Sequence, residues 1–207
     1  MFRIGLTGGI AAGKSVTTAR LAELGAVVID HDVLAREALA PGSLGLTEVA
    51  QRFGDALIRP DGTLDRSALG ALVFQDDDAL AALEAIVHPA VRRLAAEREA
   101  TAVAANPQAV VVHDIPLLVE TGQQDLFGLI IVVHAPEEVR LARLITERAM
   151  TASEARARLA AQADDVERLA VADVVLDSTG PLPERLAKVD ALWERLVEEA
   201  VAEADRP

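Results

Sequence analysis

A glycine-rich stretch near the start of the sequence, GLTGGIAAGKS at residues 5–15, combines residue types that bind phosphate groups. It fits the spacing Gly8-x-x-x-x-Gly13-Lys14-Ser15. Glycines let the backbone turn tightly, so that successive N–H groups point toward one anion. The lysine of this pattern reaches the β- and γ-phosphates of a nucleotide, and the serine hydroxyl offers an oxygen ligand to Mg²⁺. The pattern is the P-loop, and it predicts binding of ATP with magnesium.

The residues around this loop support the same interpretation. A predicted strand precedes it and a predicted helix, KSVTTARLAEL, follows it, which is the context that a P-loop requires. The alternative, a glycine-rich turn with an exposed lysine, is disfavoured because motif and context agree. Lys14 is one of only two lysines, and we expect it to act in catalysis as well as in binding. The expected ATP-binding residues of the loop are Gly9, Ile10, Ala11, Ala12, Gly13, Lys14, Ser15 and Val16.

Two aspartates follow the next apolar run, in VVIDHDVLAR. Asp30 and Asp32 fall at the carboxyl end of a predicted strand, the edge of an open α/β sheet where ligands bind. Carboxylates beside a phosphate site indicate a magnesium ion or an acceptor hydroxyl between them. Either aspartate could instead cap the helix that follows. The local pattern leaves both interpretations open, although a cap needs only one of the two.

The elements that must position these residues form an α/β pattern. Most of the predicted strands are continuous apolar runs, as in a parallel sheet covered by helices. About eighty residues separate the second strand from the third, which indicates a helical insertion. We therefore expect a P-loop NTPase core with a five-stranded parallel sheet. The predicted strands are Phe2–Thr7, Ala26–Asp30, Ala109–Asp114, Leu129–Ala135 and Val174–Asp177.

Local signals predict how several helices begin and end. Pro89 lies inside a long helical run, which it is expected to break or kink. Thr151 followed by Glu154 resembles a capping box, so a helix should start there. The C-terminal stretch PLPERLAKVDALWERLVEEAVAEA predicts an amphipathic helix that closes the fold.

Composition limits the class of protein. The chain has 207 residues, 51% of them hydrophobic, which is enough for one domain with a sizeable core. It has no cysteine, so disulfides and thiolate metal sites are excluded. A net charge of −13 argues against broad binding to nucleic acid. With no signal-peptide pattern and no long apolar run, the sequence predicts a cytoplasmic protein that binds a small molecule, with no membrane and no protein partner inferred.

One segment is positively charged although the chain as a whole is negatively charged. Between Arg140 and Arg158 it holds five arginines and two glutamates, a net charge of +3. Arginine side chains suit the charge that spreads over the oxygens in phosphoryl transfer. The alternative is a solvated helix face, but such faces usually mix the two signs more evenly.

Together these motifs resemble dephospho-CoA kinases over nearly the whole chain. The resemblance is carried by LTGGIAAGKS, VIDHDVLAR, DGTLDRSALGALVF, LEAIVHP, IPLLVE, the arginine segment ending at Gln162, and LAVADVVLD. It implies transfer of the ATP γ-phosphate to the ribose 3′-hydroxyl of 3′-dephospho-CoA, giving CoA and ADP, the last step of coenzyme A biosynthesis. The broader alternatives are another nucleoside monophosphate or small-molecule P-loop kinase, and an ATP-dependent switch or binding module.

The resemblance also implies roles for individual residues. Asp32 would be the general base, and Arg143 and Arg148 would contact ATP from an arginine-rich lid. It implies a single kinase domain with a core at about 1–36, 107–142 and 169–207, a helical CoA-binding insertion at about 37–106 and a lid at about 143–168. The residues expected on the acceptor side are Asp32, Arg66, His88, Pro116, Leu117, Leu118 and Glu120.

Two of the expected residues keep a structural alternative. Asp114 ends an apolar strand as an acid that could hold Mg²⁺ together with Ser15, or it could have a purely structural role. His88 could be an ordinary buried histidine.

A few positions depart from the usual pattern of the family. Ala11 and Ala12 stand where Gly-Ser is common, and His31 stands between the two aspartates where a small residue is common. Asp177-Ser178 replaces a frequent Asp-Asn, and Arg168 replaces a frequent lysine. None of these departures removes a chemical role.

Overall fold

The computed structural model describes residues 1–204 and divides the chain into two compact units. One unit combines Met1–Asp30 with the chain from Thr101 onward, and the other is His31–Ala100. The second unit thus begins and ends about six residues before the expected insertion at 37–106. No helix in the described part of the chain is long and apolar enough to cross a membrane.

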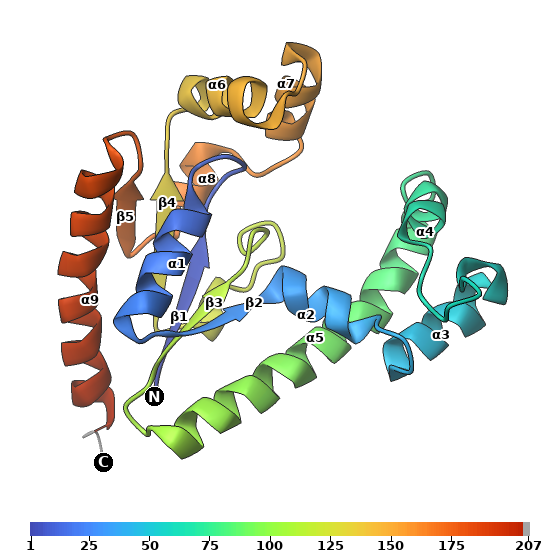
Figure 1. The fold of residues 1–207 in the computed structure, drawn as a ribbon, viewed down its shortest axis with the longest axis horizontal. Coiled ribbons are helices and arrows are strands. Elements are labelled where there is room, and N and C mark those ends of the chain that lie inside the picture. Colours follow the sequence, from blue (N-terminus) through green and yellow to red (C-terminus); the bar gives the residue numbers. More distant parts are fainter. Residues whose placement is uncertain (205–207) are drawn as a thin grey trace. The chain divides into compact units, whose positions relative to one another are not determined.

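The first unit is built on a five-stranded parallel sheet, as the apolar runs predict (Figure 1). The strand order is β2-β3-β1-β4-β5, so β1 lies in the middle, with Ile4 opposite Val112 of β3 and Leu129 of β4. Each observed strand agrees with its predicted range to within one residue at either end. The strands are β1 (Phe2–Thr7), β2 (Val27–Asp30), β3 (Val110–Asp114), β4 (Leu129–His134) and β5 (Val174–Asp177).

Burial explains why these runs are continuous rather than alternating. All residues of β3 are buried, and β1 and β4 are buried along nearly their whole lengths, because both faces of the sheet are covered. Helices α1 (Lys14–Leu24) and α9 (Leu182–Ala204) pack side by side over one face. Leu21 of α1 and Leu196 of α9 are fully buried there against Ile4 and Ile131. On the other face, Leu118, Ile130 and Val132 form a smaller apolar cluster.

Three helices follow β4, namely α6 (Glu137–Arg148), α7 (Ala152–Ala160) and α8 (Asp165–Ala170). Helices α6 and α7 lie beyond the carboxyl end of β4 (Figure 1), whereas Leu169 of α8 packs against the apolar cluster on one face of the sheet. The predicted capping box is confirmed, because the Thr151 side chain accepts a hydrogen bond from the backbone N–H of Glu154 while the Glu154 carboxylate accepts one from the N–H of Thr151. Leu144 of α6 packs against Ala155 and Leu159 of α7, so the two helices share a small core.

The second unit is helical and has its own core. Ser43 caps its second helix by accepting a hydrogen bond from the N–H of Leu46 at 3.1 Å. Val49 is fully buried at the centre, with Leu57 and Leu69 around it. Glu37 accepts two hydrogen bonds of 3.0 Å from Arg98. The elements are α2 (His31–Ala38), α3 (Leu44–Phe53), the short 3₁₀ helix η1 (Asp55–Leu57), α4 (Arg66–Val73) and α5 (Asp77–Ala105), of which α5 continues past the end of the unit.

Of the two effects predicted for Pro89, the break does not occur, and the kink stays a prediction. Helix α5 runs without interruption through this residue for 29 residues. A proline removes one backbone hydrogen bond, the one that the carbonyl four residues earlier would accept. Pro89 and Ala85 are both exposed, and the helix continues through the proline despite this loss.

Candidate active site

The glycine-rich loop joins the central strand β1 to helix α1, as its motif predicts. Gly8 has to be a glycine because a Cβ atom there would lie 2.5 Å from the backbone carbonyl oxygen of Val133. Gly13 precedes α1 in the left-handed region, with φ of 96°, where glycine carries no steric penalty. The free N–H groups at the start of α1 and the positive end of its dipole therefore face the loop. This geometry is suited to an anion.

Ala11 also lies in the left-handed region, with φ of 59°. An alanine in this conformation costs about 1–2 kcal/mol relative to the right-handed region. The turn is held by a hydrogen bond from the N–H of Ala12 to the carbonyl of Gly9 at 2.9 Å. The departure from the family's common glycine is thus accommodated with strain.

The lysine of the motif has an acidic partner at the end of the neighbouring strand. Lys14 Nζ donates a hydrogen bond to Asp114 Oδ1, and Thr18 Oγ1 donates one to Asp114 Oδ2 at 2.9 Å. Asp114 is 5% exposed and pairs with Leu6 in the register of β1 and β3. The sheet therefore brings the strand-end acid and the loop lysine together.

Oxygen ligands suited to magnesium lie in the same place. Ser15 is exposed in the first turn of α1 and follows Lys14, the residue whose side chain contacts the Asp114 carboxylate. Among the described residues, no group of three or more His, Cys, Asp or Glu side chains could hold a metal alone. These residues fit a magnesium ion that takes most of its ligands from phosphates and water, as Mg²⁺ does in ATP-dependent enzymes.

Arg143 of α6 reaches the loop directly. Its Nη1 atom donates hydrogen bonds to the carbonyl oxygens of Ala11 at 3.1 Å and Ala12 at 3.2 Å. Its Nη2 atom donates to the carbonyl of Ser178, after β5, at 2.7 Å, and the Ser178 hydroxyl donates to the Ala12 carbonyl. Arg143 thus joins three segments that are far apart in the sequence, and it holds a positive charge next to the loop.

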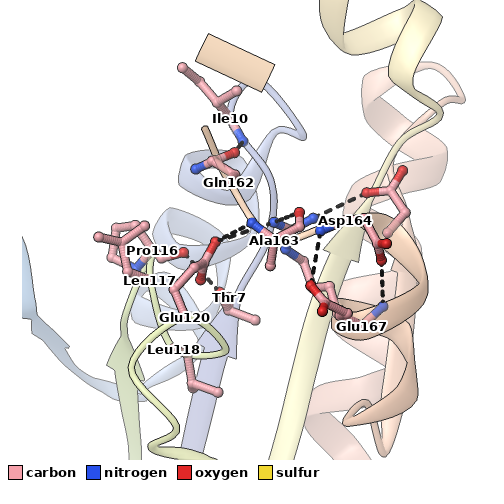
Figure 2. Close-up of polar contacts among 12 residues, drawn as sticks. Thr7, Ile10, Pro116, Leu117, Leu118, Glu120, Gln162, Ala163, Asp164 and Glu167 are labelled. Carbon is pink, nitrogen blue, oxygen red and sulfur yellow. Dashed lines mark hydrogen bonds and ion pairs between the residues drawn. The ribbon is translucent and has the colours of Figure 1, made fainter. Parts of the chain in front are cut away.

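A second set of contacts ties the loop to the segment between α7 and α8 (Figure 2). The N–H of Ile10 donates to Gln162 Oε1 at 2.7 Å. The N–H of the next residue, Ala163, donates to Glu120 Oε1 at 2.9 Å, and Arg168 lies 3.6 Å from the same carboxylate. Glu120, expected on the acceptor side, therefore contacts the end of the expected lid segment.

The segment at residues 140–158 exposes less unpaired positive charge than its composition predicts. Arg140 is 5% exposed, donates to the carbonyl of Ala135 and pairs with Asp165 at 2.8 Å. Its charge is therefore neutralised inside the fold. Arg148, at the end of α6, is exposed and forms no ion pair within residues 1–204.

Asp32 belongs to the second unit and lies in the first turn of α2, two residues after the last residue of β2. Because α2 begins at His31, Asp32 is inside the helix rather than at its cap. Its side chain is exposed and has no hydrogen-bond or ion-pair partner among the described residues. Asp30, the other candidate cap, directly precedes the helix.

Two further expected acceptor residues lie on the surface of the same unit. Arg66 begins α4 and donates a hydrogen bond to the carbonyl of Arg36 at 3.3 Å. His88 is exposed on α5, which excludes the interpretation as a buried histidine.

The Pro-Leu-Leu segment after β3 has both buried and exposed members. The Pro116 carbonyl accepts a hydrogen bond from Thr7 Oγ1 at 3.3 Å, which fixes the segment to the end of β1. Leu118 is fully buried under the sheet, whereas Leu117 is 48% exposed. The buried leucine anchors the segment and leaves its neighbour accessible.

Comparison with known proteins agrees with the resemblance seen in the motifs. A family model described as Dephospho-CoA kinase matches residues 2–184. The chain belongs to the dephospho-CoA kinase family. A dephospho-CoA kinase from Leifsonia xyli subsp. xyli is 50% identical over 193 residues, which cover 93% of this chain and 98% of that protein.

Solved structures show the same fold as this member of the dephospho-CoA kinase family. A crystal structure from Thermus thermophilus is 35% identical, covers 94% of this chain and 97% of its own, and has a TM-score of 0.79. Dephospho-CoA kinase from Campylobacter jejuni is 27% identical, covers 95% of this chain and 98% of its own, and has a TM-score of 0.72. The predicted α/β fold and the predicted enzyme class, an ATP-dependent kinase, are confirmed.

Sequence reasoning missed several residues that contact the loop of this dephospho-CoA kinase family member. Thr18 lies one helical turn after Lys14, and that spacing could have indicated its contact with the same acid. Ser178 was noted only as a departure from Asp-Asn, yet its hydroxyl and carbonyl both bind next to the loop. Arg185 lies near Gly13 and carried no signal, because α9 was expected only to close the fold.

The loop after β5 is held by an ion pair at its base. Asp177 accepts hydrogen bonds from Lys188 Nζ at 2.9 Å and from Thr179 Oγ1 at 2.7 Å, and also from the Thr179 N–H at 3.0 Å. The hydrogen bond from Lys188, followed by those from Thr179, lowers the pKa of Asp177 to about 2. This pair fixes the residue that precedes Ser178.

Replacing Lys188 with methionine should raise the pKa of Asp177 toward its ordinary value. Because the folded-state pKa is lowered, the pair stabilises the fold above the unfolded pKa of about 4 and loses this effect as the pH falls toward about 2. The stability difference between the wild type and Lys188→Met should therefore shrink from pH 5 to pH 2. An NMR titration of the Asp177 carboxyl measures the pKa.

The matched control is Arg195→Met, which removes another exposed cation of α9, paired with Glu199 at 3.7 Å. It should leave the titration of Asp177 unchanged. An Asp177 that titrates at the same pH in the wild type and in Lys188→Met would contradict the assignment.

Proposed function

We propose that this chain transfers the γ-phosphate of ATP to the ribose 3′-hydroxyl of 3′-dephospho-CoA, giving CoA and ADP. The observation that carries the proposal is the loop between β1 and α1, which Lys14 and Arg143 flank in a chain of this family and which we take as the site of the phosphates. We place the reaction in the cytoplasm, where ATP is available.

The donor side of the proposed reaction rests on residues of the first unit. Residues 9–16 would hold the phosphates through the Lys14 side chain and through backbone N–H groups other than those of Ala12 and Val16, which donate to the carbonyls of Gly9 and Gly13. Arg143 and Arg148 would neutralise charge that develops during transfer, and Arg143 is already held against the loop. Residues 143–168 form the proposed lid, and Gln162 ties its far end to Ile10.

Magnesium would be held by Ser15 and by Asp114, whose oxygens are the kind of ligand that this ion prefers. When bound, Mg²⁺ neutralises charge on the phosphate oxygens. Lys14 would exchange part of its contact with Asp114 for contact with the phosphates.

The acceptor side of the proposed reaction includes Asp32. As the 3′-oxygen forms its bond to the γ-phosphorus, the bond from that phosphorus to the β-γ bridging oxygen breaks, and ADP leaves. Asp32 would take the proton of the attacking hydroxyl. Its exposed carboxylate has no partner within residues 1–204, so it is available for this role.

The helical unit, with Arg66 and His88 on its surface, would bind the acceptor. From the first unit, Pro116, Leu117, Leu118 and Glu120 would line the acceptor side, with Leu118 acting as the buried anchor of the segment.

Release of ADP from ATP with magnesium should depend strictly on dephospho-CoA. The acceptor hydroxyl is required because the γ-phosphoryl group has no other nucleophile when water is excluded. The measurement compares dephospho-CoA with AMP, adenosine and pantetheine phosphate, and mass spectrometry should show that the product has gained one phosphate.

Turnover with a different acceptor would support a P-loop kinase but would contradict the assignment of dephospho-CoA as the acceptor. Release without any acceptor would favour an ATP-dependent switch or binding module.

Changing Asp32 to asparagine should leave ATP binding intact and lower kcat by ~10²–10⁴, because the amide cannot accept the hydroxyl proton. Steady-state kinetics measure kcat, and calorimetry measures the Kd for ATP. Asp78→Asn is the matched control, because Asp78 is also an exposed aspartate in the first turn of a helix of the same unit. Near-normal turnover in Asp32→Asn would show that Asp32 is not the base.

Changing Lys14 to methionine should abolish measurable ATP binding and turnover, because the phosphates lose their central cation. This change also leaves the buried Asp114 carboxylate without its ion pair, which itself destabilises the fold. The double variant Lys14→Met/Asp114→Asn removes that effect and should melt at a higher temperature than Lys14→Met, still without binding ATP.

Lys188→Met replaces the other lysine and should bind ATP normally. Normal ATP binding by the double variant would contradict the P-loop assignment.

A further inference from the structure

Two pairs of arginines face the phosphate-binding loop from different sides. A Cβ atom at Gly9 would meet the Nη1 atoms of both Arg140 and Arg168. A Cβ atom at Gly13 would lie 2.8 Å from Nη2 of Arg185 and 3.6 Å from Nη1 of Arg143. Four guanidinium groups therefore contact a loop that is itself rich in N–H donors.

The pair near Gly9 is neutralised by carboxylates. Asp165 lies 2.8 Å from Arg140 Nη2 and 3.1 Å from Arg168 Nη1, and Glu120 lies 3.6 Å from Arg168 Nη2. Both arginines are nearly fully buried, at 5% and 2% exposure. The charge of this pair is balanced by protein carboxylates, which indicates a structural role.

The pair near Gly13 has no such acid. The hydrogen bonds of Arg143 go to the Ala11, Ala12 and Ser178 carbonyls and the Ser178 hydroxyl, which are uncharged acceptors. No ion pair of Arg185 occurs within residues 1–204. Burial, followed by the positive charge of Arg143, lowers the pKa of Arg185, while Glu147 and Asp177 act more weakly in the opposite direction. Two partly buried cations thus remain side by side without a counter-charge in contact.

We propose that Arg185 is a nucleotide-binding residue that contacts the phosphate chain of ATP together with Arg143. The inference rests on the proposed function, because that function puts phosphates against the N–H groups near Gly13. A planar guanidinium matches phosphate oxygens in two-point contacts, and an anion between the two arginines replaces their repulsion with attraction. The first turn of α9, beginning at Leu182, then forms part of the nucleotide site.

The experiment measures the Kd of two probes, ATP and inorganic tripolyphosphate, by displacement of a fluorescent ATP analogue. Tripolyphosphate carries the phosphates without the base. Arg185→Gln should weaken both probes about tenfold or more, a loss typical of one charged contact. Arg195→Gln, on the same helix and exposed, should stay within about twofold of the wild type.

Two further measurements separate nucleotide binding from a structural role. Arg185→Gln should not lower the melting temperature without nucleotide, because it removes a cation that repels Arg143 and has no acid in contact. Arg185→Lys, which keeps the charge, should recover part of the lost affinity. Added salt should weaken ATP binding more steeply in the wild type than in Arg185→Gln.

Unchanged affinity for both probes in Arg185→Gln would overturn the inference. So would a loss for ATP alone, because that result would place Arg185 against the base. Failure of the proposed function looks different: the wild type would not bind ATP, or Lys14→Met/Asp114→Asn would bind it normally. If the wild type binds ATP and that double variant does not, unchanged affinity in Arg185→Gln rejects only the role of Arg185.

Discussion

The structure around the active-site loop is governed by one electrostatic constraint: donors and cations crowd together at the end of β1, and only some of the cations have a carboxylate partner. Lys14, the N–H groups of α1 and four arginines lie within contact distance of one short loop. A parallel sheet makes this arrangement possible, because β1 lies between β3 and β4 and their carboxyl ends meet at one edge. The same sheet also provides a carboxylate that balances one of these charges, because β3 ends in Asp114 beside Lys14.

The loop needs external support because its conformation is strained. Ala11 is in the left-handed region, where an alanine is disfavoured, and the carbonyls of Ala11 and Ala12 point toward a protein side chain. Arg143 satisfies both carbonyls, and Gln162 accepts from the N–H of Ile10 on the other side. The close approach of β4 at Gly8 fixes the start of the loop. Segments more than 100 residues away in the sequence thus hold a turn that its own residues would not hold alone.

The parts of the fold that were predicted correctly depend on short-range patterns. The five strands are continuous apolar runs, and the capping box of Thr151 lies within four residues, so local sequence contains the information. The effect of Pro89 could not be decided from local sequence, because a proline inside a helix can break it, kink it or leave it continuous. Which of these occurs depends on how the rest of the molecule packs around the helix.

The candidate site shows the same division between local and distant information. The P-loop and the aspartates after β2 are short motifs, and they were found from the sequence. From the sequence, Arg140 was included in the positive charge of the segment at residues 140–158, but in the structure it is buried and paired with Asp165. No motif in the sequence indicated that Arg185 lies near Gly13. An arginine has the same local pattern whether it meets a carboxylate, a carbonyl or a ligand, so composition alone could not separate these cases.

The internal partners of the loop also affect which ligand it can bind. Lys14 already contacts Asp114, and the N–H of Ile10 already contacts Gln162, so a nucleotide must compete with existing partners. A singly charged anion would exchange one contact for another with little net gain. A triphosphate presents several charged oxygens at once, and it can engage Lys14 and the α1 donors while neutralising the unpaired arginines near Gly13. The internal partners therefore hold the loop and favour ligands with a chain of phosphates over single anions.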